Sequence, residues 1–107
     1  MQPLNSSQAK YLRGLAHSLK PVVFVGRKGV NAAVLDSIRE ALAAHELIKV
    51  RFTDLRDRRV MAEAAAEVQQ KTDSCLAGAI GRVAVFYRPQ PDPEKRKIVL
   101  PRGSSNR

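Results

Sequence analysis

The stretch VVFVGRKGVN, residues 22–31, decides the architecture of this chain. Its first four residues, Val22–Val25, form the short continuous apolar run that is typical of a buried central strand. The turn GRKG (26–29) follows, and Asn31 is a residue type that commonly caps a helix. The stretch therefore predicts a strand, a glycine-bounded turn and the beginning of a helix.

Two cations, Arg27 and Lys28, stand at the tip of this turn between Gly26 and Gly29. Glycine has no Cβ, so a ligand can approach the backbone closely and positive φ is tolerated. The helix that follows adds free N–H groups and the positive end of its dipole, and both favour a phosphate. This combination is typical of a nucleic-acid backbone clamp, as in KH-type RNA binders. An ordinary tight turn without a ligand is the alternative.

Charge is unevenly distributed along the chain. Among 107 residues there are 19 Lys and Arg against 10 Asp and Glu, which gives a formal net charge of +9. Residues 1–35 contain no acid, and acids occur only from Asp36 onward, mostly in the later helices. Cations concentrated around the turn favour a polyanionic partner, whose binding would weaken in salt. A basic surface that only keeps the protein in solution is the simpler interpretation.

Apolar residues at helical spacing predict three helices, near residues 6–18, 31–45 and 57–70. Ser6 or Ser7 is the expected cap of the first helix, and Asp57 is the expected cap of the third. The apolar stripe of the first helix consists of Leu12, Leu15, Ala16 and Leu19. Lys10 and Arg13 lie off that stripe, so we expect their side chains to face solvent or a ligand.

Strands are predicted at residues 22–25, 47–53, 75–80 and 83–88. In the second strand the side chains alternate, with Ile48, Val50 and Phe52 on one face and Leu47, Lys49 and Arg51 on the other. Cations on the open face of a half-buried strand point to a ligand. Gly81-Arg82 predicts a two-residue hairpin between the last two strands, with glycine first as in a type II′ turn.

The element order α-β-α-β-α-β-β predicts an α/β fold. Right-handed crossovers are expected to place parallel strands side by side, and the final hairpin adds an antiparallel strand. We expect a two-layer sandwich in which a mixed four-stranded sheet packs on helices. Residues 1–88 form the predicted domain. Residues 89–107 form a Pro-rich basic tail, in which the apolar residues 98–100 dock and residues 103–107 are disordered.

Motifs for catalysis and metal binding are missing from the sequence. It contains no Gly-x-Ser-x-Gly or P-loop motif, and one cysteine with two distant histidines gives no zinc-site spacing. We therefore expect no catalysis, no cofactor and no metal. Cys75 cannot form an internal disulfide, which fits the cytoplasm, and is expected in the core. No apolar run is long enough to cross a membrane, so no membrane partner is expected, and we expect a monomer.

Several segments together resemble the CRM domain (chloroplast RNA splicing and ribosome maturation), in particular its bacterial single-domain YhbY-type members. They are LAH (15–17), LKPVV (19–23), GRKG (26–29), HELIKV (45–50), IG (80–81), FYRP (86–89) and RKIVLP (96–101). The match covers roughly residues 7–102. It implies a fold like the C-terminal domain of translation initiation factor 3. It also implies an RNA-binding protein that associates with precursors of the large ribosomal subunit and assists their assembly.

The resemblance also implies which residues contact RNA. Gly26 and Gly29 match the loop glycines of the family, and Arg27 and Lys28 occupy its variable tip. Further positions that are commonly basic in the family are Lys20, Lys49 and Arg51. The chain departs from the family pattern where Asp73 follows Lys-Thr in place of a glycine, and where Gly78-Ala79 replaces bulkier strand residues.

Two functions from different classes therefore remain. The first is RNA binding in ribosome assembly, and the second is a protein–protein adaptor whose basic face meets an acidic partner. The aromatic residues are few and mostly expected in the core: Tyr11, Phe24, Phe52, Phe86 and Tyr87. We accordingly expect base stacking to contribute little and the RNA backbone and shape to be the main features recognised.

Overall fold

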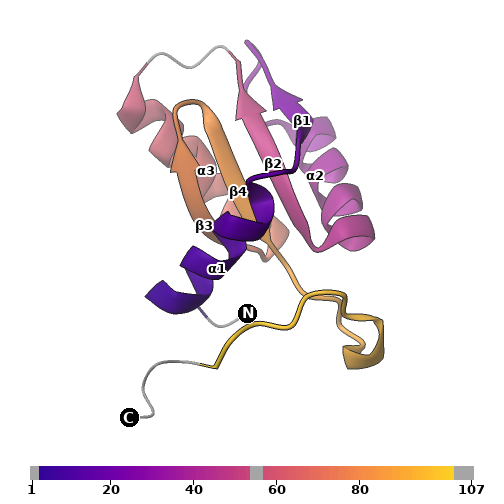
Figure 1. The fold of residues 1–107 in the computed structure, drawn as a ribbon. Helices are drawn as coiled ribbons and strands as arrows, with labels where there is room; N and C mark the ends of the chain where they lie inside the picture. Colours follow the sequence, from indigo (N-terminus) through magenta and orange to yellow (C-terminus); the bar gives the residue numbers. More distant parts are fainter. Residues whose placement is uncertain (1–2, 54–56, 103–107) are drawn as a thin grey trace.

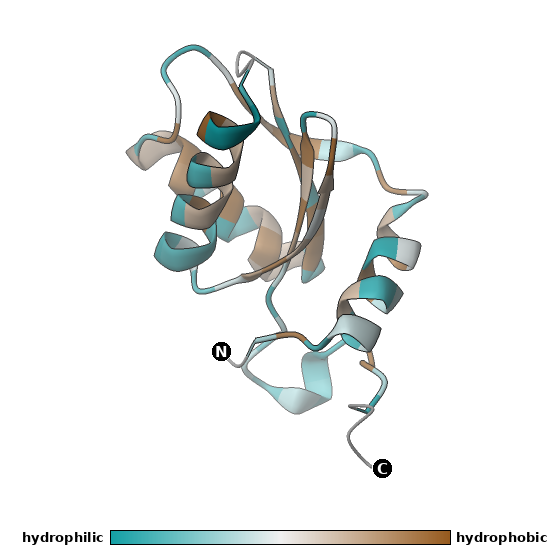
Figure 2. Ribbon diagram, turned by 90° about the vertical axis from the view of Figure 1, so that its left-hand side faces the viewer, coloured by the Kyte–Doolittle hydropathy of each residue, from teal (hydrophilic) through white to brown (hydrophobic). Residues whose placement is uncertain are grey.

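The computed structural model describes residues 3–53 and 57–102. Its elements are α1 (Ser6–Ala16), β1 (Pro21–Val25), α2 (Ala32–His45), β2 (Leu47–Phe52), α3 (Arg58–Thr72), β3 (Cys75–Ile80), β4 (Val83–Tyr87) and the 3₁₀ helix η1 (Pro93–Lys95). The strands form one mixed sheet with α2 and α3 on one face and α1 across the other (Figure 1, Figure 2). The predicted α/β class, with three helices and a mixed four-stranded sheet, is confirmed.

The strand order β1-β2-β4-β3 corrects the prediction for residues 22–25. β1 lies at an edge of the sheet and pairs only with β2, in parallel. Val23 and Val25 are buried on the α2–α3 side, but Val22 and Phe24 are 49% and 58% exposed. The prediction of a buried central strand was wrong, because a short apolar run does not reveal how many neighbours a strand will have.

The expected side-by-side placement of the parallel strands does not extend to β3, because β4 separates it from β2. β4 pairs antiparallel with both β2 and β3, so it lies between them. β1 and β2 are therefore the one pair of parallel neighbours among the described strands. The two-residue hairpin at Gly81-Arg82 is confirmed, since Ile80 pairs with Val83 and Gly81 has a φ of +60°.

The larger core lies between the sheet and the layer of α2 and α3. Ile38 of α2, Val68 of α3 and Phe52 of β2 are completely buried in it. Val60, in the first turn of α3, is 45% exposed and lies outside this core. Burial of such apolar side chains is the main source of stability in a domain of this size.

Helix caps follow the sequence closely for α2 and α3. The side chains of Asn31 and Asp57 accept hydrogen bonds from backbone N–H groups in the first turns of these helices, as predicted. α1 differs, because its cap is Asn5 rather than a serine. Asn5 and Gln8 bond to each other's backbone N–H groups and form a capping box, and the helix ends earlier than predicted, at Ala16.

α1 crosses part of the opposite sheet face. Leu12 and Ala16 are buried there against β2, β3 and β4. Leu15 and Leu19, the other members of the predicted stripe, are each 39% exposed, since only one side of the helix meets the sheet and Leu19 lies beyond its end. In Figure 1 α1 lies over the lower half of the sheet and leaves the upper half of this face uncovered.

The carboxylate of Glu46 joins the tail to the domain. Glu46 is fully buried at the end of α2 and has a φ of +64°. Its side chain accepts hydrogen bonds from the backbone N–H groups of Gln90 at 2.8 Å, Lys97 at 2.7 Å and Ile98 at 3.1 Å. A buried carboxylate is tolerated when such donors replace its water.

Beyond Glu46, the tail packs along the α1 side of the molecule. Ile98 and Leu100 pack against the small core under α1, whereas Val99 between them is 80% exposed. Gln8 of α1 donates a hydrogen bond to the carbonyl oxygen of Pro101 at 3.1 Å. The predicted disorder of residues 103–107 lies outside the described residues, and the domain boundary at residue 88 stays a prediction.

Candidate nucleic-acid interface

Acidic residues are unevenly distributed among the elements of the fold. α1, the four strands and residues 26–31 contain no Asp or Glu. The described acids belong to α2 and α3, to the residues flanking them and to the tail: Asp36, Glu40, Glu46, Asp57, Glu63, Glu67, Asp73, Asp92 and Glu94. We call the surface formed by α1, the turn at residues 26–29 and the α1 side of the sheet the acid-free face. Its electrostatic character is set by Lys and Arg.

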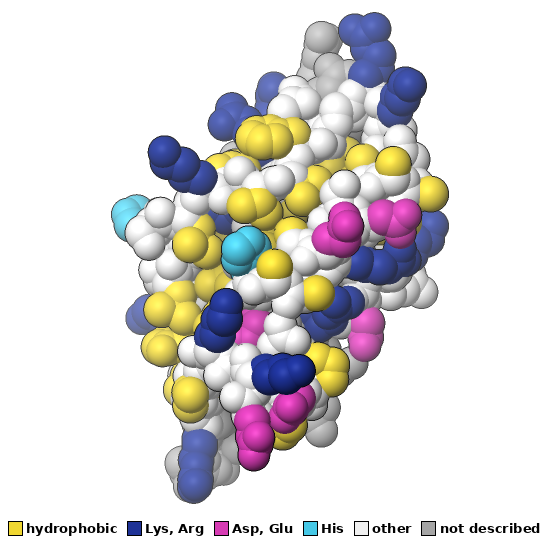
Figure 3. Space-filling model, turned by 90° about the vertical axis from the view of Figure 1, so that its right-hand side faces the viewer, with side chains coloured by type: hydrophobic (Ala, Val, Ile, Leu, Met, Phe, Trp, Pro, Cys, Tyr) yellow, Lys and Arg dark blue, Asp and Glu magenta, His cyan; other side chains and the backbone are white. Residues whose placement is uncertain are grey.

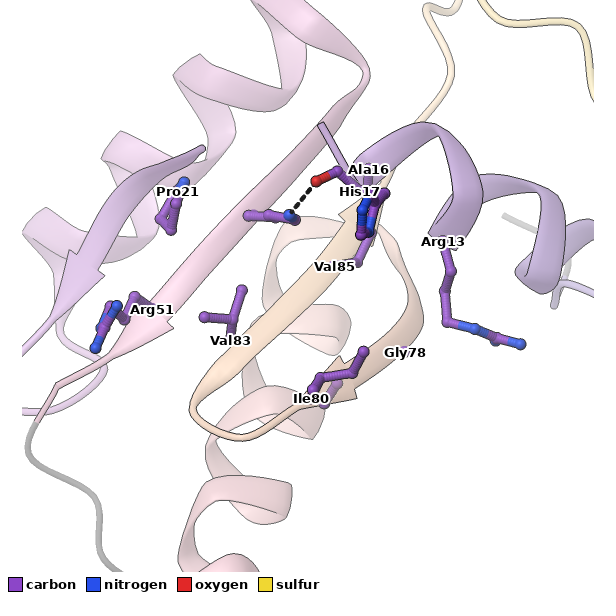
Figure 4. A pocket seen from close by; sticks show the side chains of 11 residues that line it. Arg13, Ala16, His17, Pro21, Arg51, Gly78, Ile80, Val83 and Val85 are labelled. Carbon is purple, nitrogen blue, oxygen red and sulfur yellow. Dashed lines mark hydrogen bonds between the residues drawn. The ribbon is translucent and has the colours of Figure 1, made fainter. Parts of the chain in front are cut away.

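A groove of about 330 Å³ opens on the acid-free face beside α1 (Figure 4). Arg13 of α1 and both Lys49 and Arg51 of β2 line it, and Ile80 and Val83 contribute apolar surface. The structure thus brings together cations that the sequence placed on a helix and on a strand. All three therefore line one groove.

Lys49 and Arg51 both point to the acid-free face, as the alternation in β2 predicted. Lys49 is half-buried, and its Nζ donates to the carbonyl oxygen of Leu19 at 2.9 Å and to that of His17 at 3.4 Å, the dashed line in Figure 4. It therefore also fixes the segment between α1 and β1. Arg51 is exposed and lies opposite Phe24 of β1.

Arg13 contacts β3 as well as solvent. Its Nη1 donates a hydrogen bond to the carbonyl oxygen of Ala77 at 2.9 Å. The aliphatic part of the side chain lies over Gly78, where an added Cβ would collide with Cδ of Arg13. Gly78, one of the departures from the family pattern, is thus the residue that lets Arg13 lie across β3.

The turn at residues 26–29 is closed by a hydrogen bond from Gly29 N–H to the carbonyl oxygen of Gly26 at 2.9 Å. Gly29 has a φ of +71°, so this position favours glycine for conformational reasons. Gly26 has no positive φ, and a Cβ there would meet only the Thr53 hydroxyl oxygen at 3.7 Å, an ordinary contact. The fold alone therefore does not require glycine at residue 26. Arg27 and Lys28 are exposed at the tip.

The beginning of α2 offers fewer free N–H groups than the sequence suggested. The Val34 N–H donates to the Asn31 side chain at 2.9 Å, and the Gly29 N–H is used within the turn. Ala32 and Ala33 are the first two residues of α2, and their N–H groups donate to none of the described residues. Two amides are thus left to meet an anion at this helix end.

A second turn adds a cation that was not among the predicted contact residues. Arg82, at the tip of the β3–β4 hairpin, is exposed and donates to the carbonyl oxygen of Thr53 at 3.4 Å. The Phe52 N–H donates in return to the Arg82 carbonyl oxygen at 2.8 Å. Arg82 therefore lies at the same end of the sheet as the turn at residues 26–29, where Figure 3 shows dark-blue side chains projecting at the top.

Two predicted contact residues lie apart from the groove. Lys20 is exposed just before β1, at the opposite end of that strand from the turn, beside Leu15 and Leu19. Lys10 is exposed on α1 beside Tyr11. Lys10 belongs to the acid-free face and Lys20 precedes it in the segment between α1 and β1, but neither lines the groove with Arg13, Lys49 and Arg51.

Two titratable side chains of the core, Cys75 and Tyr87, lose a proton less readily than usual. Burial raises the pKa of the Cys75 thiol and that of the Tyr87 hydroxyl. Cys75 is buried, as predicted. Within residues 3–53 and 57–102 no three His, Cys, Asp or Glu side chains are grouped to hold a metal ion, and no helix is long and apolar enough to cross a membrane.

Comparison with known proteins gives a consistent result. The model of the CRS1 / YhbY (CRM) domain matches residues 4–88. An RNA-binding protein of Haemophilus influenzae is 39% identical over 102 residues, which cover 95% of this chain and 99% of the relative. The Probable RNA-binding protein YqeI of Bacillus subtilis is 37% identical over 100 residues, covering 92% and 99%.

The fold also has a solved counterpart. The solution structure of a hypothetical protein from Staphylococcus aureus has a TM-score of 0.73 and 33% sequence identity, and covers 92% of this chain and 99% of that one. Sequence and structure thus agree over nearly the whole chain. The chain belongs to the CRS1 / YhbY (CRM) domain family.

Proposed function

We propose that this protein binds RNA through the acid-free face and that the phosphate backbone is its main ligand. The observation that carries the proposal is the separation of charge: α1, the strands and the turn at residues 26–29 contain cations and no acid. Phosphates approaching this face meet attraction without local repulsion, and each one neutralised releases counterions. The names of the relatives, which are called RNA-binding proteins, support this choice of polyanion.

In the proposed complex the backbone runs from the turn at residues 26–29 into the groove beside α1. Arg27 and Lys28 contact phosphates at one end, and Arg51 and Arg13 contact them along the groove. Gly26 supports this arrangement because the fold does not require a glycine there, whereas close approach of a ligand to the backbone does. The two unused amides of α2 provide further donors.

The first test is a salt titration of binding to a ribosomal RNA fragment, with an acidic protein as a control partner. Affinity should fall steeply as salt rises, in proportion to the number of phosphates neutralised. Affinity for RNA that does not change with salt would contradict a backbone contact. Tighter binding to the acidic protein than to RNA would favour the adaptor function instead.

We further propose that the RNA is that of large ribosomal subunit precursors and that the protein, acting as a cytoplasmic monomer, assists their assembly. This follows from the family resemblance. On a sucrose gradient of cell extract the protein should sediment with the large-subunit precursor and be less abundant on mature ribosomes. Recovery only in the slow fractions at low salt would contradict this proposal and leave RNA binding in general to be tested by the titration.

A further inference from the structure

Phe24 is unusually exposed for a phenylalanine. It is 58% exposed and Tyr11 is 43% exposed, whereas Phe52, Phe86 and Tyr87 are buried. Most aromatic side chains were predicted in the core, and three of the five lie there. An exposed phenylalanine beside a cationic surface therefore needs an explanation of its own.

Strand register places Phe24 at one end of a row across the sheet. Phe24 pairs with Arg51, Arg51 with Val83, and Val83 with Ile80. Directly paired residues on neighbouring strands share a face, so these four side chains cross the acid-free face side by side. Ile80 is 82% exposed, so the row has apolar surface at both ends and a guanidinium between them.

This row lies at the end of the sheet where the turn at residues 26–29 begins. Phe24 comes two residues before Gly26, and the Thr53 N–H donates to the Val25 carbonyl oxygen at 2.8 Å, which holds the ends of β1 and β2 together. A chain whose phosphates contact the turn therefore has its bases within reach of the row. Aromatic rings and arginine planes are the surfaces on which unpaired bases stack.

We propose that an unpaired RNA base stacks on Phe24, with Arg51 beside it, so that the protein prefers single-stranded RNA segments over duplex. This inference rests on the proposed function and specifies its substrate. A second copy of this chain is a poorer occupant, because Arg51, Arg27 and Lys28 of two copies would then approach one another as like charges. A nucleic acid supplies both the flat apolar group and the opposite charge.

The test compares Phe24→Leu with Tyr11→Leu, which removes an exposed aromatic ring from α1, outside both the row and the groove. Both variants are titrated with oligouridine and with an RNA duplex of equal length. Phe24→Leu should bind oligouridine about tenfold more weakly, because one stacked base is lost. Its duplex affinity and the salt dependence of its oligouridine binding should match wild type, since the phosphate contacts remain. Tyr11→Leu should match wild type throughout.

A fluorescence measurement reports the contact directly, because the chain has no tryptophan. Phe24→Trp introduces a single indole that oligouridine should quench, whereas an abasic oligonucleotide of the same length should not. Tyr11→Trp is the control and should respond to neither. This readout also shows that the variant is folded and binds.

The outcomes separate this inference from the proposed function. If wild type binds oligouridine with steep salt dependence but Phe24→Leu binds equally tightly, stacking is overturned and RNA binding stands. If wild type binds neither oligouridine nor the duplex, both the stacking inference and the proposed RNA-binding function are overturned. If wild type is a dimer by analytical ultracentrifugation and Phe24→Leu a monomer, the row is an interface between copies, which also overturns the stacking proposal.

Discussion

The layer of α2 and α3 contains both acids and cations, whereas the acid-free face contains cations alone. In the helical layer, cations stand beside acids: Arg39 pairs with Asp36 at 3.0 Å, and Lys71 pairs with Glu67 at 2.8 Å. On the acid-free face Arg51 has Phe24 and Val83 as its cross-strand neighbours. Cations gathered without acids repel one another in the free protein, and an anionic ligand removes that repulsion.

The two regions also differ in the exposure of their apolar side chains. Between the sheet and the helical layer Phe52 and Ile38 are completely buried, whereas Phe24 and Ile80 on the other side are 58% and 82% exposed. Both sets come from strands or helices of the same small domain. The difference indicates that one side of the sheet stabilises the fold and the other is available to a ligand.

The sharpest test of this division replaces the same residue type on the two sides. Phe52→Ala should lower the free energy of unfolding by about 3–5 kcal/mol, because it removes a buried ring and leaves a cavity. Phe24→Ala should change it by about 0.5 kcal/mol, as exposed side chains usually do. Urea denaturation followed by circular dichroism measures both. Equal losses would mean that the acid-free face is part of the stabilising core.

Glu46 gives the next largest expected effect. Glu46→Ala removes the acceptor for the Gln90, Lys97 and Ile98 N–H groups and should lower the free energy of unfolding by about 2–3 kcal/mol. Proteolysis should then cleave the released tail near η1. Glu40→Ala, an exposed acid on α2, is the matched control and should leave both stability and the cleavage rate unchanged. A tail that stays protected in Glu46→Ala would show that Ile98 and Leu100 hold it without the carboxylate.

The two glycines of the turn should separate stability from binding. Gly29→Ala should be destabilising by about 1 kcal/mol, because an L residue is strained at a φ of +71°. Gly26→Ala should leave stability nearly unchanged and weaken RNA binding, because its methyl group meets only Thr53 within the protein but stands where the backbone approaches the ligand. Thermal melts and RNA titrations of both variants check this. Unchanged binding by Gly26→Ala would make the turn purely structural.

The smallest effect is expected for the surface ion pair of α3. Glu67→Ala removes the partner of Lys71 and should lower the free energy of unfolding by about 0.3–0.5 kcal/mol, the usual contribution of an exposed pair four residues apart. RNA affinity should not change, because the pair lies on the helical layer. A clear gain in RNA affinity would instead show that the negative charge of this layer reaches the ligand and that the two sides are not independent.

The sequence predicted best what local chemistry determines. Asn31 and Asp57 were recognised as caps, and the alternation of Lys49 and Arg51 was read correctly, because a cap or a strand face depends only on nearby residues. The place of β4 could not be predicted in this way. A tight hairpin makes β3 and β4 neighbours but does not determine which of them lies next to β2, and this choice depends on packing across the whole sheet.

The candidate site was predictable only where it depends on local sequence. Charge counts and the turn at residues 26–29 located the cations, but the exposure of Phe24 follows from the edge position of β1. The reason for a glycine at residue 78 is also non-local, because the side chain of Arg13 from α1 lies over it. Asp73, one of the departures from the family pattern, caps the C-terminus of α3 with a φ of +53°, the left-handed conformation that favours glycine.

The most direct test of the whole account compares two charge-matched double variants in the same salt titration. Arg27→Ala with Lys28→Ala removes two cations from the acid-free face, and Arg39→Ala with Lys71→Ala removes two from the helical layer. The first pair should weaken RNA binding and make the dependence of log affinity on log salt shallower by about two units, one for each lost phosphate contact. The second pair should keep the wild-type slope. Equal slopes for the two double variants, whether both reduced or both unchanged, would contradict the claim that RNA is bound on the acid-free face.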